Sequence, residues 1–260
     1  MAAIKNPIEK SSYSIVRTEN PNGIIFANLG SEATVEQAKR AVDMLEADAL
    51  QIHLNVIQEL TMPEGDRDFT GAILRIEEIA SKLEVPVIIK ETGFGFSRES
   101  IHKLKGLQLG AIDVGGFGGT NFAAIENERR QRQLRYFNNW GIPTAASLIE
   151  AKIEAPNTVI LASGGIQDAL DIVKCLALGA SAVGLAGIVL KTLVEDGEEA
   201  TVSFIQEVIE DMTMLMVALG ARSVEELQNV PLILSGNLFH HLIQRGYEPN
   251  MYANRQKMKR

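Results

Sequence analysis

Six short apolar runs constrain the fold of this 260-residue chain more than any other feature. They lie at residues 24–30, 50–55, 86–91, 111–116, 159–165 and 182–187, and each ends in small or polar residues. The runs are nearly continuously hydrophobic rather than alternating, which is typical of strands covered on both faces. Because only 5% of the residues are aromatic, aliphatic side chains must fill the core. The runs predict six strands of a parallel sheet in an α/β protein.

Helical patterns separate most of these strands. We predict helices over residues 34–45, 71–83, 97–107, 145–153, 167–178 and 198–219, and a short helix over residues 223–228. Thr34 and Ser97 are suitable N-caps, and Gly179 is a suitable C-terminal stop. Strand and helix alternation at this spacing indicates right-handed βαβ units. We therefore expect one domain over residues 1–242, followed by a flexible C-terminal tail over residues 243–260.

The position of the glycine-rich turns favours a barrel over an open sheet. An open doubly wound sheet binds phosphate at a Gly-rich turn after its first strand, but the first run here ends in Asn28-Leu29-Gly30-Ser31. Ser163-Gly164-Gly165 and Ala186-Gly187 instead close the last two runs. A TIM barrel has its phosphate site after strands 7 and 8. We therefore predict a TIM-type (β/α)8 barrel of which this chain encodes only the equivalents of strands 3–8.

The same two turns are the candidate phosphate site. Glycine allows backbone N–H groups to approach an anion closely, and the N-terminus of a following helix adds its dipole. The alternative is that these glycines only make tight turns between strand and helix. Their occurrence on neighbouring strands favours the phosphate site.

Two further strand ends carry side chains suited to ligand binding. The Lys90 ammonium must find an anion or water, so it forms an ion pair with Glu91 or Asp113, or it faces an electron-rich cofactor ring, which we favour. Alternation places His53 on one face with Gln51 and Asn55, in the lumen of a barrel. A histidine there can bind a ligand, although an ordinary core position is the better explanation of a single histidine.

Three loops complete the list of candidates. Gln58-Glu59 and residues 62–67 form an acidic loop that either is solvated or holds Mg²⁺ beside a substrate phosphate. The glycine-dense residues 115–121 would let a flat ring or a phosphate pass close to the backbone. The charged residues 126–132 form either a solvated face or a lid.

Charge and cysteine content exclude several classes of protein. The net charge is −8, and the only basic cluster is the C-terminal segment 255–260, so we expect no nucleic-acid partner. No apolar run reaches the roughly 18 residues of a membrane span. Cys175 is the single cysteine, which excludes a disulfide scaffold. With no signal peptide at the N-terminus, we expect a cytoplasmic protein.

Five segments of the chain resemble the type 2 isopentenyl diphosphate isomerase family. They are residues 26–30, 51–59, 62–67, 115–122 and 162–167, which read FANLG, QIHLNVIQE, MPEGDR, GGFGGTNF and ASGGIQ. The resemblance implies a TIM barrel that depends on FMN and Mg²⁺. It also implies interconversion of isopentenyl and dimethylallyl diphosphate with no net redox change, in which the reduced flavin itself moves the proton and NADPH serves only to reduce the flavin.

The resemblance also implies site residues. Those that would bind FMN are Asn28, Lys90, Thr120, Gly164, Gly165, Ile166, Ala186 and Gly187. His53 and Gln58 would hold the diphosphate substrate, and Glu59 would hold Mg²⁺. No catalytic side chain is expected beyond the flavin, and we expect a homo-oligomer.

The chain departs from the family pattern at its front, where a basic substrate-binding segment and two βα units have no counterpart. This departure explains the count of six strands. It leaves two alternatives to the isomerase: a flavin-dependent oxidoreductase on the same barrel, and an inactive truncated remnant that needs a partner to supply the missing strands.

Overall fold

The computed structural model describes residues 10–255 and contains a six-stranded parallel sheet. The strands are β1 (Phe26–Gly30), β2 (Ala49–Leu54), β3 (Val87–Glu91), β4 (Ala111–Asp113), β5 (Val159–Ser163) and β6 (Ala182–Gly184). They are paired in the order of the sequence, from β1 to β6. All six predicted strands are present, and the prediction of a TIM-type barrel with six encoded strands is confirmed.

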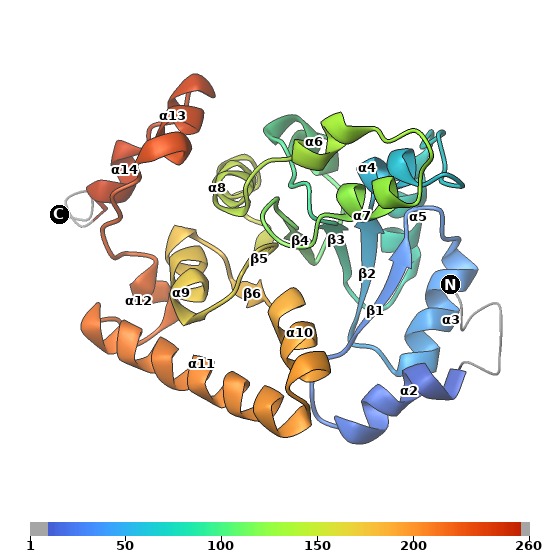
Figure 1. Ribbon diagram of the computed structural model, residues 1–260, viewed down its shortest axis with the longest axis horizontal. Helices are drawn as coiled ribbons and strands as arrows, with labels where there is room; N and C mark the ends of the chain where they lie inside the picture. Colours follow the sequence, from blue (N-terminus) through green and yellow to red (C-terminus); the bar gives the residue numbers. More distant parts are fainter. Residues whose placement is uncertain (1–9, 256–260) are drawn as a thin grey trace.

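Helices surround this sheet (Figure 1). They are α2 (Lys10–Glu19), α3 (Val35–Leu45), α4 (Val56–Thr61), α5 (Ala72–Lys82), α6 (Arg98–Leu104), α7 (Phe122–Glu128), the 3-10 helix η2 (Arg135–Asn139), α8 (Thr144–Glu154), α9 (Ala169–Leu178), α10 (Gly187–Glu195), α11 (Glu198–Ala218), α12 (Val224–Leu227), α13 (Gly236–Gln244) and α14 (Asn250–Ala253). The seven predicted helices correspond to α3, α5, α6, α8, α9, α11 and α12. Helices α2, α4, α7, α10, α13 and α14 were not predicted.

The predicted helix caps are borne out by hydrogen bonds. Thr34 accepts from the Gln37 N–H while the Gln37 side chain accepts from the Thr34 N–H, which is a capping box. Ser97 accepts from the Ser100 N–H at the start of α6. At α9 the predicted start was two residues early, because Asp168 is the N-cap and accepts from the Asp171 N–H.

Alternation along the strands separates a small lumen from a larger outer core. Ala49, Ile88 and Ala111 form a cluster with Leu161 on the lumen face. The alternate residues, such as Ile52, Ile89 and Ile160, are fully buried and pack against the helices. The aliphatic lumen cluster lies toward the amino ends of the strands. Polar residues occupy the lumen positions at the carboxyl ends.

Within residues 10–255, the sheet has two unpaired edges. β1 and β6 are its outermost strands, and Figure 1 shows them at its opposite ends. Phe26 on β1 is 43% exposed, and on the long helix α11 only Thr201 is buried. Large apolar side chains of α10 and α11 are also exposed, namely Leu190, Leu193, Val194, Val202, Ile205, Ile209, Met214 and Val217. Such edges and apolar faces are what a closed barrel covers.

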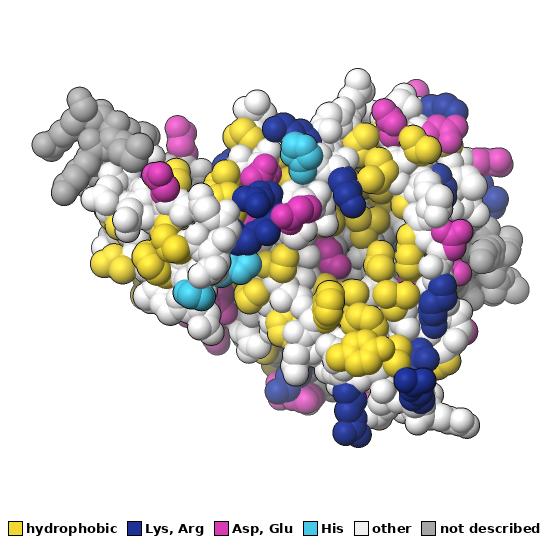
Figure 2. All heavy atoms as spheres, turned by 90° about the horizontal axis from the view of Figure 1, so that it is seen from above, with side chains coloured by type: hydrophobic (Ala, Val, Ile, Leu, Met, Phe, Trp, Pro, Cys, Tyr) yellow, Lys and Arg dark blue, Asp and Glu magenta, His cyan; other side chains and the backbone are white. Residues whose placement is uncertain are grey.

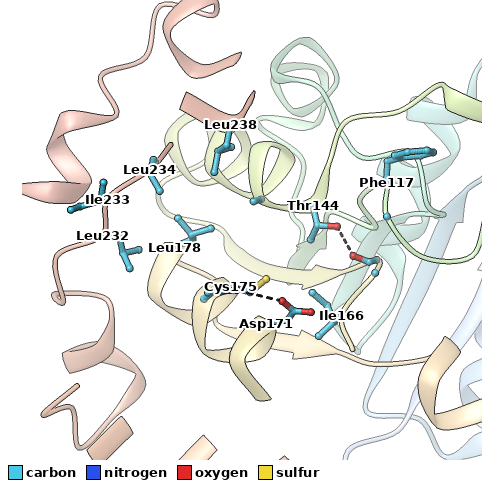
Figure 3. Close-up of a pocket in the computed structure, with 15 residues that line it drawn as sticks. Phe117, Thr144, Ile166, Asp171, Cys175, Leu178, Leu232, Ile233, Leu234 and Leu238 are labelled. Atoms are coloured by element: carbon cyan, nitrogen blue, oxygen red, sulfur yellow. Dashed lines mark hydrogen bonds and ion pairs between the residues drawn. The ribbon is translucent and has the colours of Figure 1, made fainter. Parts of the chain in front are cut away.

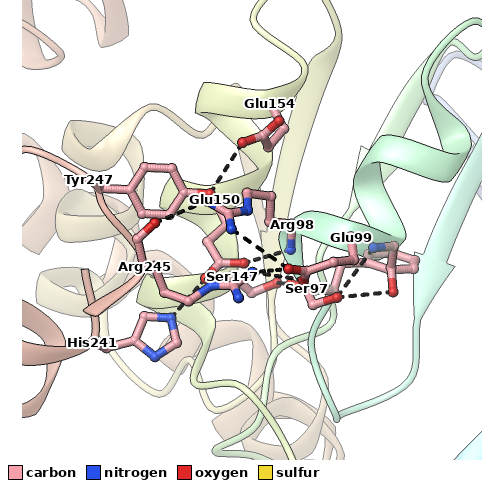
Figure 4. A network of polar contacts seen from close by, with 11 residues as sticks. Ser97, Arg98, Glu99, Ser147, Glu150, Glu154, His241, Arg245 and Tyr247 are labelled. Carbon is pink, nitrogen blue, oxygen red and sulfur yellow. Dashed lines mark hydrogen bonds and ion pairs between the residues drawn. The ribbon is translucent and has the colours of Figure 1, made fainter. Parts of the chain in front are cut away.

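A polar network holds the C-terminal helices to the barrel (Figure 4). The fully buried Glu150 on α8 accepts hydrogen bonds from the Arg98 N–H, from His241 and from the Arg245 guanidinium. Arg245 also forms two hydrogen bonds to Glu99 at the start of α6. The network therefore joins three segments that lie far apart in the sequence.

The domain boundary expected at residue 242 falls inside α13. Beyond it, Tyr252 is buried, and the Arg255 guanidinium donates to the Ala177 carbonyl 2.6 Å away. The described part of the expected tail thus contacts the barrel, whereas residues 256–260 lie outside the described part of the chain. Within residues 10–255, no helix is both long enough and apolar enough to cross a membrane.

Candidate active site at the carboxyl ends of the strands

Polar side chains gather on the lumen face where the strands end. Strand register pairs Gly30 with His53, His53 with Lys90, and Lys90 with Asp113. Because alternate residues of a strand share a face, Asn28, His53, Lys90, Asp113 and Ser163 all point into the lumen. The face seen in Figure 2 carries Lys and Arg side chains dispersed among acidic and apolar ones, with no continuous basic surface.

Asn28, Gln51 and His53 form one hydrogen-bonded group on β1 and β2. Asn28 donates from Nδ2 to Gln51 Oε1, 2.7 Å away, and its Oδ1 lies 2.7 Å from His53 Nδ1. Since an amide oxygen only accepts, His53 carries its proton on Nδ1, and Nε2 keeps a lone pair that faces the lumen. Burial lowers the pKa of His53 below its usual value, which favours the neutral ring. His53 is therefore prepared to accept a hydrogen bond.

Lys90, Asp113 and Ser163 form a second group on β3, β4 and β5. Lys90 Nζ lies 2.9 Å from Asp113 Oδ2 and donates to Ser163 Oγ at 2.6 Å. Ser163 in turn donates to Asp113 Oδ1 at 2.7 Å. Of the two ion pairs that the sequence left open for Lys90, the structure forms the one with Asp113.

Glu91 lies on the opposite face of β3 from Lys90. Its side chain is buried and accepts hydrogen bonds from the Phe94 and Gly95 N–H groups, at 2.6 and 3.1 Å. Burial raises the pKa of Glu91 to about 8 in spite of these hydrogen bonds. Glu91 therefore shapes the loop after β3 and does not contribute to the lumen.

The two glycine-rich turns lie against the loop that follows β4. A Cβ added at Gly164 would lie 2.0 Å from the Gly116 carbonyl oxygen, and one at Gly165 would lie 2.6 Å from the Gly118 backbone. A Cβ at Gly187 would lie 3.7 Å from Thr120 Oγ1. The structure thus brings the predicted residues Thr120, Gly164, Gly165 and Gly187 together.

Backbone donors at these turns are available to an anion. In the described part of the chain, Gly164, Gly165 and Ile166 donate no hydrogen bond. Helix α10 begins at Gly187, directly after the predicted residue Ala186, and has no side-chain cap. Unpaired N–H groups beside an uncapped helix N-terminus are a phosphate-binding arrangement. These turns therefore fit the phosphate of a flavin nucleotide.

Gln58 and Glu59 lie on α4, the short helix that follows β2. Glu59 accepts from Asn55 Nδ2 at 2.8 Å and from the Asp66 N–H at 2.9 Å. The Gln58 amide makes no side-chain hydrogen bond among the described residues, so it is available to a ligand. No cluster of three or more His, Cys, Asp or Glu side chains suited to a metal occurs in residues 10–255. Glu59 alone fits Mg²⁺ only where a substrate diphosphate supplies further oxygen ligands.

The charged segment at residues 126–132 is neither free nor fully solvated. Arg129 pairs with Glu126 and with Glu64, so it joins this segment to the loop after β2. Arg130 donates to the Thr61 and Met62 carbonyls, where α4 ends. These contacts connect the loops after β2 and β4 across the mouth of the lumen.

A cavity of about 460 Å³ lies between α9 and the segment before α13 (Figure 3). It shares Gly164, Gly165 and Ile166 with the candidate phosphate site, but most of its walls are apolar side chains such as Leu178, Leu232, Leu234 and Leu238. Cys175 also lines it; burial raises the pKa of this thiol to about 11, which makes it a poor nucleophile. The cavity is therefore mainly apolar, with Thr144, Asp171 and Lys174 as its charged or hydroxyl-bearing lining residues.

Comparison with known proteins identifies the family. Residues 21–233 match the family model of the FMN-dependent dehydrogenases. The isopentenyl-diphosphate delta-isomerase of Geobacillus sp. (strain WCH70) is 56% identical over 254 residues, which is 98% of this chain and 73% of the relative. That of Bacillus anthracis (strain A0248) is 60% identical over 255 residues, with the same coverage. The chain belongs to the type 2 isopentenyl-diphosphate delta-isomerase family.

Solved structures support the fold of this isomerase family member. A mandelate oxidase variant matches with a TM-score of 0.63 at 18% identity, covering 86% of this chain and 66% of that one. A lactate oxidase of Pediococcus acidilactici matches with a TM-score of 0.65 at 16% identity, covering 86% of this chain and 65% of that one. This chain thus spans slightly less than two thirds of the length of these two oxidase chains. At 16 to 18% sequence identity, the likeness concerns the fold alone.

Sequence reasoning missed three residues that the structure places in the site. Ser163 was considered only as part of a turn, Asp113 only as an ion partner, and Gln51 only as a residue of the His53 face. The register of parallel strands could have found Asp113, because it is the direct neighbour of Lys90 on the next strand.

Proposed function

We propose that this chain isomerises isopentenyl diphosphate to dimethylallyl diphosphate, using reduced FMN and Mg²⁺. The proposal depends on three features that this member of the type 2 isomerase family combines on one barrel. They are the N–H groups of Gly164–Ile166, which donate no hydrogen bond in the described part of the chain, the uncapped start of α10, and the Lys90 ammonium. The first two fit a phosphate and the third fits an electron-rich ring.

Each residue of the site has a place in this proposal. The backbone of Gly164, Gly165 and Ile166, together with Ala186 and Gly187, would hold the FMN phosphate. Thr120, Asn28 and Lys90 would contact the rest of the cofactor. Thr120 is exposed beside Gly187, and Asn28 is exposed on β1, so both are accessible to a ligand in the mouth.

The reaction moves a double bond and requires one proton to be added at the terminal methylene and one to be removed from the allylic carbon. Bound reduced FMN would supply this proton transfer, and NADPH would serve only to reduce it. His53 would contact the substrate, and the Gln58 amide, which makes no side-chain hydrogen bond among the described residues, would donate to the diphosphate. Glu59 would bind Mg²⁺ together with diphosphate oxygens.

The isomerase is also proposed to act in the cytoplasm as a homo-oligomer. The free, buried Cys175 is compatible with a reducing compartment. The exposed apolar faces of α10 and α11 are compatible with association.

The proposal is tested with purified protein, FMN, dithionite, Mg²⁺ and isopentenyl diphosphate, by following the olefinic proton of the product in NMR spectra. We expect product formation without net oxidation of the flavin. Gln58→Ala and Glu59→Gln should each lower kcat/KM by about 100-fold, since both contact the diphosphate or its metal. Glu78→Gln, on the outer helix α5, is the matched control and should leave the rate unchanged.

Two outcomes would contradict the isomerase. Substrate-dependent net oxidation or reduction of the flavin would instead identify an oxidoreductase, which the match to FMN-dependent dehydrogenases makes the second candidate. FMN binding without product formation under all conditions would support an inactive barrel that needs its open wall completed.

A further inference from the structure

The Lys90 ammonium is held by a closed ring of hydrogen bonds. Two of its three N–H groups are used, one for Asp113 Oδ2 and one for Ser163 Oγ, while Ser163 donates to Asp113 Oδ1. Asp113 Oδ1 also accepts from the Gly115 N–H at 3.2 Å. The three side chains come from adjacent strands, so the rigid sheet sets their spacing. One N–H of Lys90 has no acceptor among the described residues and is available to a ligand in the lumen.

We propose that Asp113, together with Ser163, is a positioning residue that holds the Lys90 ammonium in place and directs its remaining N–H at the cofactor. This inference rests on the proposed binding of FMN in the lumen, and it assigns a function to a carboxylate whose hydrogen-bond partners are Lys90, Ser163 and the Gly115 N–H. Asp113 acts on the cofactor only through Lys90.

Burial and geometry support this assignment. The side chain of Asp113 is 9% exposed and that of Lys90 is 24% exposed, so the carboxylate is the more deeply buried partner of the pair. A lysine has four rotatable side-chain bonds, and two fixed acceptors remove most of that freedom before a ligand binds.

The bonding of Asp113 argues against direct chemistry by this carboxylate. Both of its oxygens accept hydrogen bonds from charged or backbone donors, and the ammonium lies only 2.9 Å away. Its effect must pass through the group it holds.

The first test needs no cofactor and measures reductive methylation of individual lysines by mass spectrometry. We expect Asp113→Asn to speed labelling of Lys90 about tenfold, because loss of the ion pair frees the side chain from its ring of hydrogen bonds and makes it accessible to the reagent. The exposed Lys82, which pairs with Glu78, is the internal control and should not change. Glu78→Gln is the matched variant and should leave the labelling of Lys90 as it is.

Ser163→Ala keeps this test decisive if Asp113→Asn fails to fold. It removes one acceptor and one donor at a half-buried position, and it should speed labelling of Lys90 about threefold, the change expected for one hydrogen bond of modest strength. Unchanged labelling of Lys90 in folded variants of both Asp113 and Ser163 would overturn the proposal.

The second test is a double-mutant cycle on FMN affinity, measured by quenching of flavin fluorescence. Lys90→Met and Asp113→Asn should each weaken FMN binding about tenfold, and the double variant should bind no more weakly than Lys90→Met alone. Multiplying effects would show that Asp113 acts independently of Lys90 and would overturn the inference. If the unaltered chain does not bind FMN, the proposed function fails, whereas the labelling test still decides whether Asp113 and Ser163 hold Lys90.

Discussion

His53 Nδ1 lies 2.7 Å from Asn28 Oδ1, and this contact decides which nitrogen of the imidazole faces the lumen. Gln51 fixes the orientation of the Asn28 amide by accepting from its Nδ2. The tautomer of His53 is therefore set by two neighbouring strands before any ligand arrives. A ligand in the lumen meets a lone pair and not a donor.

We expect His53 to stay neutral at neutral pH. Burial lowers its pKa, so the ring should titrate below 6.5, and protonation at lower pH would convert Nε2 from an acceptor into a donor. NMR titration of the imidazole carbon-bound protons, with the His53 signal identified through its absence in His53→Gln, measures this midpoint. A midpoint at or above 6.5 would contradict the assignment.

Gly164→Ala is expected to disrupt the candidate phosphate site. The added Cβ would lie 2.0 Å from the Gly116 carbonyl oxygen, and the φ of +105° is unfavourable for alanine. The loop after β4 must then move, and FMN affinity should fall at least about tenfold, equivalent to roughly 1.4 kcal/mol.

Gly106→Ala is the control for this change, because Gly106 has a similar φ of +100° and no atom within 4 Å of the added Cβ. Gly106→Ala introduces the same backbone strain but no steric clash of the added Cβ. It should therefore lower the free energy of unfolding and leave FMN affinity unchanged. Equal loss of affinity in both variants would mean that strain alone explains the effect.

Ionisation of the buried Glu91 carboxyl should lower the free energy of unfolding as the pH rises. Its pKa is about 8 in the folded chain against 4.5 for an ordinary Glu, so the folded state holds the proton more tightly. This contribution is complete below pH 4.5 and is lost as the pH rises toward 8 and beyond. Between pH 5.5 and 8, urea unfolding should show a decline in unfolding free energy that is about 1 to 3 kcal/mol larger than in Glu91→Gln. Parallel pH profiles for the two proteins would refute the prediction.

Arg245→Met is expected to loosen the C-terminal helices. It removes a cation from the fully buried Glu150 carboxylate, and stability should fall by about 2 to 4 kcal/mol. Glu99→Gln removes only the exposed partner of the same arginine and should change the unfolding transition little. Hydrogen exchange of amides in α13 and α14 locates the effect; equal exchange in both variants would argue against the network as the anchor.

The apolar face of α11 should bind hydrophobic probes. Ile209 is 59% exposed and Val217 is 75% exposed, so Ile209→Lys with Val217→Lys should reduce binding of the dye ANS and self-association while changing the unfolding free energy by less than about 0.5 kcal/mol. A large loss of stability would show instead that this face is already packed in solution.

Strands were predictable from the sequence because their burial on both faces leaves continuous apolar runs. Helix α10 was missed for the same reason: its apolar residues follow β6 with only a short turn between them, so no change of period marks where the strand ends. Helix α2 was missed because its sequence is mostly polar, with Tyr13, Ile15 and Val16 as its only large apolar residues.

Residues of the candidate site were predictable where a strand ends in an unusual side chain, as at His53 and Lys90. Their partners were harder to find. The hydrogen bond between Asn28 and His53, and the ring that joins Lys90 to Ser163, link residues 25 and 73 positions apart. Such contacts depend on strand register, which a pattern within one run does not contain. The roles of these residues toward FMN, Mg²⁺ and substrate stay predictions.

The strand order has a consequence for how the chain acquires its structure. Each strand pairs with the next one in the sequence, from β1 to β6. Every pairing therefore closes only the chain segment that connects two consecutive strands. In a closed barrel, the pairing of the first with the last strand spans nearly the whole chain and carries the largest loop-closure entropy. These six strands form no such long-range pairing. They can therefore assemble one βα unit at a time. Closing a barrel around them would be a separate, later step, in which β1 and β6 gain strand partners on a sheet that has already formed.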